Sequence, residues 1–222
     1  MAFKLTIDAG LGPVDYTSYL IPESLTVEDS LTVPTLLSFT LVNKDNAFIV
    51  PQRSSYCRLF SGKFNLPVAT GFVTSVPAQT FLGMGNNIPA FGFQRYSYDV
   101  QVTSDEWLLN VKTVPFLPPF VNLGQGQILA SLANILVPDF FDTTSFVASG
   151  DLVPYFPYDP TQNWSDIAKS FADASRFRYK VLDKVIYFQP YGDAPLGVTY
   201  NETHVFLVPH RQVLIRSEHK VQ

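Results

Sequence analysis

Two pairs of neighbouring acidic residues are the first candidates for acid–base chemistry in this sequence. Glu28-Asp29 and Asp105-Glu106 each place two carboxyl groups side by side. Glycoside hydrolysis needs two carboxyls that face each other across a cleft, one of them with a raised pKa. Adjacent residues do not meet that requirement. We therefore predict that both pairs mark solvated chain reversals, with Asp105-Glu106 in a turn or at the start of a short helical turn.

Cys57 is the single cysteine, so one chain can form neither a disulfide nor a cysteine-based zinc site. A nucleophilic thiol would need partial exposure and a nearby base. Cys57 lies between Tyr56 and Arg58 in an expected strand, and we predict that it is buried and packs in the core.

The three histidines, His204, His210 and His219, are six and nine residues apart, which places no two of them on one helical face. We predict that they are ordinary surface or partner-facing residues. No metal-ligating residue is predicted in this chain.

Two glycine-rich stretches could cradle a phosphate. Gly124-Gln125-Gly126 precedes an expected helix, as in turns whose backbone amides bind an anion. The dinucleotide fingerprint, however, requires Gly or Ala where Leu129 stands, and no P-loop lysine follows. Gly83-Met84-Gly85 is expected in a loop between strands. With no Gly-x-Ser-x-Gly motif either, we predict no catalytic residue, no cofactor-binding residue and no cofactor; the chain is not expected to be an enzyme.

A third pattern concerns basic residues. Arg176, Arg178 and Lys180 alternate with apolar residues and would form one basic face of a strand. This face could meet an acidic partner or a nucleic-acid backbone. It could equally be a solvated sheet edge, since charged residues protect exposed edges from pairing. Both interpretations stay open.

The composition favours a globular, charge-poor protein that associates with other chains. Of 222 residues, 46% are hydrophobic and 14% aromatic, which is enough to fill a core. Only 15% are charged, where roughly 25% is typical. We infer that copies of the chain or partners cover much of its surface, because interface cores are depleted in charge and enriched in aromatics. A compact monomer with a polar, uncharged surface is the alternative.

The net charge of −4 provides no basic field for holding DNA or an anionic membrane. No apolar run is long enough to span a membrane, and the first residues lack the apolar stretch of a signal peptide. We therefore expect a protein that is made and kept soluble inside a cell.

The elements that must position these residues fall into two parts. Residues 1–112 alternate apolar and polar side chains with turns about every ten residues, which is typical of a β-sandwich or barrel. The clearest expected strands are Leu36–Val42, Tyr56–Phe60, Ala69–Val76 and the stretch around Tyr96–Val102.

The second part begins after three prolines, Pro115, Pro118 and Pro119, which indicate a linker. The spacing predicts a helix over Gln127–Leu136 with Ile128, Leu132 and Ile135 on one face. An irregular connection is expected over Pro138–Pro160. A second helix is expected after it, capped by Asn163, with four apolar residues on one face: Trp164, Ile167, Ala168 and Phe171. A hairpin over Arg176–Phe188, turning at Leu182-Asp183-Lys184, and strands at Val205–Val208 and Gln212–Arg216 complete it. We thus expect a β domain (1–114), a small α+β domain of two helices and a hairpin (115–190), and C-terminal strands (191–222) that could return to the β domain.

This order of elements resembles the front part of bacteriophage tail hub proteins, which include baseplate hubs and tail-tip hubs. The resemblance covers most of residues 25–190. It rests on a strand that ends in a polar turn, a strand that enters an acidic turn, and a helix followed by a hairpin: Phe39–Asn43, Tyr98–Val102 with Asp105–Leu109, and Trp164–Phe171 with Val185–Pro190.

The resemblance implies a tail-tube-like barrel and a ring of identical chains that continues the tail tube at the virion tail tip, after assembly in the host cytoplasm. Such hubs are trimers with two tube-like domains per chain. Only one such domain is evident here, so a hexamer stays open beside the trimer that we favour. The implied partners are the distal tail protein, the tail tube, the tape-measure protein and tail-fibre or spike proteins, with DNA only as passing cargo. The alternatives are a distal tail protein, a β-sandwich carbohydrate- or receptor-binding module, or a tail-associated hydrolase.

Overall fold

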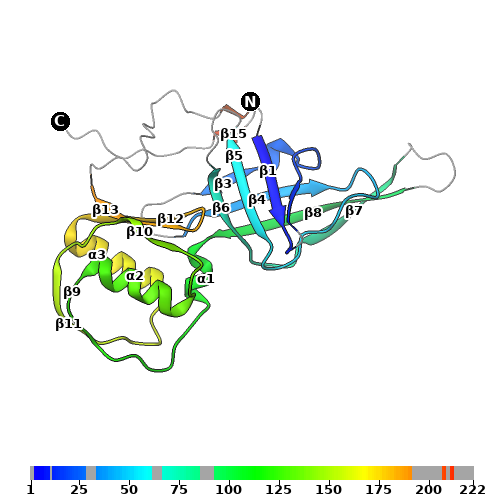
Figure 1. The fold of residues 1–222 in the computed structure, drawn as a ribbon. Helices are drawn as coiled ribbons and strands as arrows, with labels where there is room; N and C mark the ends of the chain where they lie inside the picture. Colours follow the sequence, from blue (N-terminus) through cyan, green and yellow to red (C-terminus); the bar gives the residue numbers. More distant parts are fainter. Residues whose placement is uncertain are drawn as a thin grey trace.

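The fold is mainly β, with a smaller part in which helices cover a sheet (Figure 1). The computed structural model describes residues 3–10, 12–28, 34–61, 67–85 and 93–191, and the short strands β14 (Leu207–Val208) and β15 (Arg211–Gln212). The mainly β class and the small α+β part predicted from the sequence are confirmed. The remaining residues of the expected C-terminal strands, and all three histidines, lie outside the described residues.

The main sheet is open. Its strands run in the order β2-β1-β5-β6-β8-β4-β3, and β7 also pairs with β8. The expected closed barrel is not found among the described residues, because β2 and β3 stand at opposite ends of this order and are only three residues long each. The eight strands are β1 (Phe3–Asp8), β2 (Pro13–Asp15), β3 (Thr26–Glu28), β4 (Leu36–Val42), β5 (Tyr56–Ser61), β6 (Pro67–Val73), β7 (Ala78–Gly85) and β8 (Phe93–Ser104).

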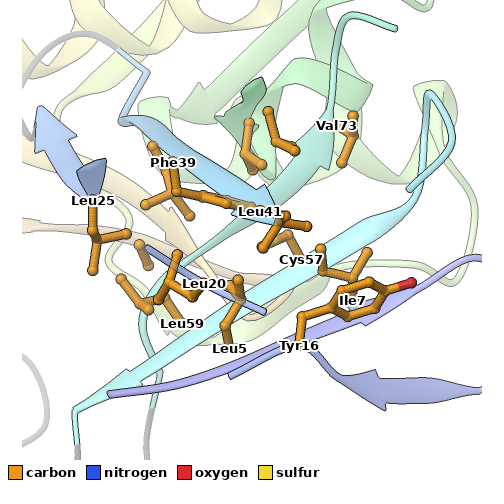
Figure 2. Packing of buried hydrophobic residues seen from close by; sticks show 14 of the residues in the cluster. Leu5, Ile7, Tyr16, Leu20, Leu25, Phe39, Leu41, Cys57, Leu59 and Val73 are labelled. Carbon is orange, nitrogen blue, oxygen red and sulfur yellow. The ribbon is translucent and has the colours of Figure 1, made fainter. Parts of the chain in front are cut away.

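Alternation of buried and less buried residues, which in β4 holds as far as Leu41, explains why β4 and β5 form where they do. Leu37, Phe39 and Leu41 of β4 point into the core, as do Cys57 and Leu59 of β5. Successive side chains of a strand point to opposite faces, so this pattern gives the sheet one apolar face. Figure 2 shows Phe39, Leu41, Cys57 and Leu59 converging with side chains of neighbouring strands. They belong to a first hydrophobic cluster: Leu5, Ile7, Tyr16, Leu20, Leu25, Leu37, Phe39, Leu41, Cys57, Leu59, Ala69, Val73, Tyr98, Val100 and Val102.

Strands β7 and β8 form a hairpin that extends away from the rest of the main sheet (Figure 1), and we call it the arm. The sequence predicted a loop at Gly83–Gly85. That prediction is wrong, because β7 continues to Gly85. A register shift between Phe81 and Gly83 accompanies a φ of +102° at Gly83, which an L side chain rarely adopts. Glycine here accommodates an irregularity within a strand.

The second part of the chain is built around two helices. Helices α2 and α3 pack against strands of a three-stranded sheet, β10-β13-β12, and α2 also contacts β9 of the two-stranded β9–β11 pair. The expected irregular connection at Pro138–Pro160 is wrong, since it contains β10 and β11. The elements are α1 (Glu106–Asn110), β9 (Phe120–Gly124), α2 (Gln125–Leu136), β10 (Asp142–Val147), β11 (Leu152–Phe156), α3 (Trp164–Ser175), β12 (Phe177–Leu182) and β13 (Val185–Pro190); a 3-10 turn, η1 (Pro22–Ser24), lies in the first part.

Helix α3 follows its predicted pattern, and α2 follows it with one exception. The four predicted face residues of α3 are all buried, and Asn163 stands at the N-cap position, although its side chain makes no capping hydrogen bond. Its backbone carbonyl accepts a hydrogen bond from the amide of Asp166 at 3.1 Å. In α2, Ile128 and Leu132 are buried, but Ile135 is exposed, because the helix ends one residue later.

These elements enclose a second hydrophobic cluster, which begins with Leu109 of α1 and includes Trp164, Tyr179 and Phe188. Leu109 thus packs with the second part, although the sequence placed it in the first domain. The division at residues 114 and 190 stays a prediction. None of the described helices is both long and apolar enough to cross a bilayer.

Candidate functional site

The carboxylates Asp105 and Glu106 are buried, which corrects the expectation that they are solvated. They lie where β8 ends and α1 begins, and their exposed fractions are 0% and 3%. Glu106 opens a short helix, as the sequence suggested. Of the other acidic pair, Glu28 is exposed at the end of β3, and Asp29 lies outside the described residues.

Asp105 holds two distant parts of the chain together. Its Oδ2 accepts hydrogen bonds from the Thr70 hydroxyl at 2.9 Å, the Lys184 backbone amide at 2.8 Å and the Tyr56 hydroxyl at 3.2 Å. Thr70 Oγ1 also accepts a hydrogen bond from the Asp183 amide at 2.8 Å. The main sheet and the hairpin β12–β13 therefore meet at one carboxylate.

We call this site the polar junction and define it by six residues. Strand β5 positions Tyr56 and Arg58, and β6 positions Thr70. Asp105 directly precedes α1, and Asp183 and Lys184 form the turn between β12 and β13.

The turn that enters the polar junction has an unusual backbone. Asp183 and Lys184 have φ angles of +49° and +67°, in the left-handed region at both central positions of a two-residue hairpin turn. Such turns prefer Asn-Gly or Asp-Gly, because a Cβ is disfavoured at positive φ. Lysine at the second position is therefore strained, and the two amide hydrogen bonds across the junction hold it in place.

Charged side chains flank the junction. Arg58 Nη2 lies 2.9 Å from Asp183 Oδ1, and both side chains are about one-third exposed. The Lys184 ammonium lies 4.5 Å from the ring centre of Phe140 and 5.4 Å from that of Tyr56. Exposed ion pairs contribute roughly 0–1 kcal/mol, so the buried hydrogen bonds to Asp105 are the stronger part of the contact.

Burial dominates the protonation of the two carboxyls. It raises the pKa of Asp105 to about 6, although hydrogen bonds from Lys184, Thr70 and Tyr56 act in the opposite direction. It also raises the pKa of Glu106 to about 7, although the neighbouring Ser104 hydroxyl acts in the opposite direction. Among the described residues, Asp105 Oδ1 and Glu106 Oε2 are buried without a hydrogen-bond partner. A raised carboxyl pKa is also typical of catalytic acids, but side chains this deeply buried present no surface to a substrate. The geometry suits a structural joint.

Cys57 is fully buried, as predicted, and burial raises the pKa of its thiol well above its usual value. We therefore expect native protein to react with iodoacetamide at least roughly 100-fold more slowly than protein unfolded in urea, since the thiolate is the nucleophile. Mass spectrometry of timed samples measures this ratio. Equal rates in the two states would contradict the burial of this side chain.

The turn Gly124–Gly126 uses its amides for packing within the chain. The amides of Gln125 and Gly126 donate to the backbone carbonyls of Asp151 and Ser149, and the amide of Gly124 donates to the side chain of Gln127. The amides that would bind an anion in a phosphate-binding turn are therefore occupied.

The expected basic strand face is only partly formed. Arg176 ends α3 in a left-handed conformation, with a φ of +58°, and lies outside the strand. Arg178 and Lys180 belong to β12, an edge strand of the three-stranded sheet, and both are half-buried. Whether they meet a partner or protect an edge stays open.

Large apolar side chains are exposed at several places, among them Val76 and Phe116, and two of these places lie on strand pairs. On the β9–β11 pair, Leu152 and Tyr155 are 67% and 62% exposed, and Val121 lies opposite Tyr155 in the register. On the arm, Phe81 and Leu82 are at least half exposed. A depression of about 390 Å³ is lined by residues that include Asp8 and Arg53. No cluster of three or more metal-ligating side chains occurs in the described part of the chain.

Sequence reasoning missed the polar junction. Its hairpin was predicted, and so was the short helical turn after β8. Nothing in the local pattern indicated that Asp105 and Lys184, 79 positions apart, would bond.

The fold is similar to solved structures of tail proteins. The 43 kDa tail protein of prophage MuSo2 from Shewanella oneidensis matches 87% of this chain with a TM-score of 0.59 and 13% identity. A tail protein from Neisseria meningitidis matches 88% with a TM-score of 0.55 and 11% identity. This chain spans 56% and 53% of those two chains. No protein family and no curated protein sequence matches it. The fold is thus of the phage tail type.

Proposed function

We propose that this chain is a non-enzymatic structural component of a phage tail, and that it forms the hub ring at the tail tip or baseplate. The observation that carries the proposal is the similarity of most of the chain to two tail proteins. At 13% and 11% identity this similarity concerns the fold, so the role is inferred from fold and surface together.

Features of the surface support association. The chain is poor in charge, and it exposes apolar side chains on the arm and on the β9–β11 pair. Strands β2, β3 and β7 each pair on one side only among the described strands. Unpaired edges and apolar patches favour contacts with other chains, and a closed ring covers every such head-to-tail surface.

The proposed partners follow from this role. Copies of the chain would form a trimer, or else a hexamer, that continues the tail tube. The ring would contact the distal tail protein, the tape-measure protein and tail-fibre or spike proteins, while DNA passes through its lumen. Assembly would take place in the host cytoplasm.

The mass of the purified protein over a range of concentrations tests the proposal. Light scattering and native mass spectrometry should give three or six copies, and negative-stain images should show rings. A single copy at high concentration would contradict a self-assembling hub. A monomer that binds a glycan would instead favour a carbohydrate-binding module.

Charged substitutions test which apolar surface is used. We expect Leu152→Glu with Tyr155→Glu on the β9–β11 pair, or Phe81→Glu with Leu82→Glu on the arm, to reduce the assembly to single chains. The free energy of unfolding should change by only about 0.5 kcal/mol per site, because exposed positions tolerate substitution. Val76→Glu, at an exposed position between β6 and β7, is the control. Intact rings in both double variants would show that association uses another surface.

A further inference from the structure

The outer half of the arm is a ribbon of two strands. Strand β4 pairs with β8 only from Ser97 onward, whereas β7 pairs with β8 from Phe93. Toward its tip the arm therefore has no third strand among the described ones. Two-stranded ribbons are marginally stable in water by themselves, so this part of the arm gains stability when another apolar surface packs on it.

The arm presents two apolar side chains for such packing. Phe81 and Leu82 are neighbours in β7, and each is at least half exposed. Leu82 is the extra residue of the register shift, because Phe81 pairs with Tyr96 and Gly83 pairs with Arg95. A bulge interrupts the regular alternation of side chains. The Phe81 ring lies 5.4 Å from the Tyr96 ring, between ring centres, so the exposed ring is supported from within the arm.

The β9–β11 pair carries a second apolar surface, which we call the β9–β11 patch and define by Val121, Leu152 and Tyr155. Val121 and Tyr155 stand opposite each other in the register, and all three side chains are at least half exposed. The pair is fixed to the body of the chain, because Phe120 and Phe156 pack against the second hydrophobic cluster.

Charge separates these two surfaces. The stretch 46–98, which contains the arm, has no Asp or Glu, and its charged residues are all basic: Arg53, Arg58, Lys63 and Arg95. The stretch 113–168, which contains the patch, has no Lys, Arg or His, and its charged residues are all acidic: Asp139, Asp142, Asp151, Asp159 and Asp166. Arg95 is exposed on the arm, and Asp151, which precedes Leu152, is exposed beside the patch. Opposite charge favours a contact between arm and patch over a contact of either surface with its own kind.

The two surfaces lie at opposite ends of the chain (Figure 1). The arm therefore does not cover the patch of its own chain, and a contact between them joins two copies. Each copy would give one arm and receive another, which makes the contact head-to-tail.

We propose that the arm of one copy docks on the β9–β11 patch of a second copy. Phe81 and Leu82 pack against the apolar side chains of the patch, and Arg95 lies at its acidic rim. The pairing rests on the self-association proposed above and adds which surface meets which.

Two variants that each lack one half of the contact test the pairing. Phe81→Glu with Leu82→Glu removes the arm's half, and Leu152→Glu with Tyr155→Glu removes the patch's half. Each variant alone should run as a single chain in size-exclusion chromatography with light scattering. Their equimolar mixture should give pairs with one chain of each kind and nothing larger, because only one intact contact can form. Native mass spectrometry with one variant labelled by heavy nitrogen identifies the pairs.

A charge reversal tests the acidic rim. Arg95→Glu, made in the variant that keeps its arm, should raise the dissociation constant of the mixed pair at least roughly fivefold, since it places like charges together. Arg53→Glu is the matched control, because Arg53 is an exposed basic residue outside the arm. It should leave the constant unchanged in the same calorimetric titration, and circular dichroism checks that all variants are folded.

The outcomes separate this pairing from the ring. Variants that stay single in the mixture, while the wild-type protein assembles, would overturn the pairing and leave the ring in place. A patch variant that assembles alone would also overturn it, since its arm would then bind another surface. Mixed pairs together with open filaments of the wild-type protein would support the pairing and contradict a closed ring.

Discussion

Replacing Trp164 with alanine is expected to lower the free energy of unfolding by about 3–5 kcal/mol, as large-to-small changes in protein cores do. Trp164 is 2% exposed at the start of α3, inside the second hydrophobic cluster. Its ring lies edge-on to Tyr179, with the centroids 6.0 Å apart, and its indole N–H donates to the carbonyl of Leu129 at 3.2 Å. Alanine would leave a cavity and remove the hydrogen bond that the indole donates to a carbonyl of α2.

Urea unfolding followed by circular dichroism measures this loss. Trp107→Ala is the matched control, because Trp107 is the other tryptophan of the chain and is only half-buried. Its ring contacts Phe72, and its removal should cost roughly 1–2 kcal/mol, less than a fully buried aromatic. If both variants lost the same stability, or if Trp164→Ala lost less than about 1 kcal/mol, the central position of this indole would be refuted.

Gly126→Ala is expected to destabilise the protein by about 3 kcal/mol, even though alanine is the better helix former by about 1 kcal/mol. A Cβ at this position would lie 1.9 Å from the backbone oxygen of Ala148. The segment cannot easily retreat, since the Gly126 amide donates to Ser149 and the Ala148 amide donates to Phe188 of β13. The glycine lets α2 approach the connection between β10 and β11.

Thermal or urea unfolding of this variant is compared with that of Ser131→Ala, a half-buried position of the same helix. The control should change the free energy of unfolding by less than about 0.5 kcal/mol, because it only improves helix propensity slightly. A Gly126→Ala protein more stable than the wild type would mean that the 148–149 segment moves aside at little cost.

Helices and strands whose apolar residues recur at a regular spacing could be predicted from the sequence. Strands β4 and β5 alternate cleanly, and α3 has four apolar residues on one face, so local sequence and final burial agree. The hairpin β12–β13 was predictable for the same reason. In these elements the side chains that define the pattern also fill the core.

Elements that depend on distant partners were not predictable. Pro154 lies inside β11, where proline argues against a strand; β11 pairs only with β9 among the described strands, and an edge tolerates proline. Asp105 and Glu106 looked like solvent-exposed residues, because nothing nearby in the sequence supplies their covering. For Asp105 that covering includes Tyr56, Thr70 and Lys184, at separations of 49, 35 and 79 positions.

Strand β8 has a mechanical consequence. The first half of β8 pairs with β7, and its last three residues pair with β6. Strand β4 pairs with β8 along Ser97–Thr103. After β8 the chain passes directly into α1. Tension applied between the arm tip and α1 would act along β8 and shear the β4–β8 hydrogen bonds together, whereas tension across the sheet would peel them apart singly. We therefore expect β8 to resist a force along its axis, between the arm and the helices, better than a force across the sheet.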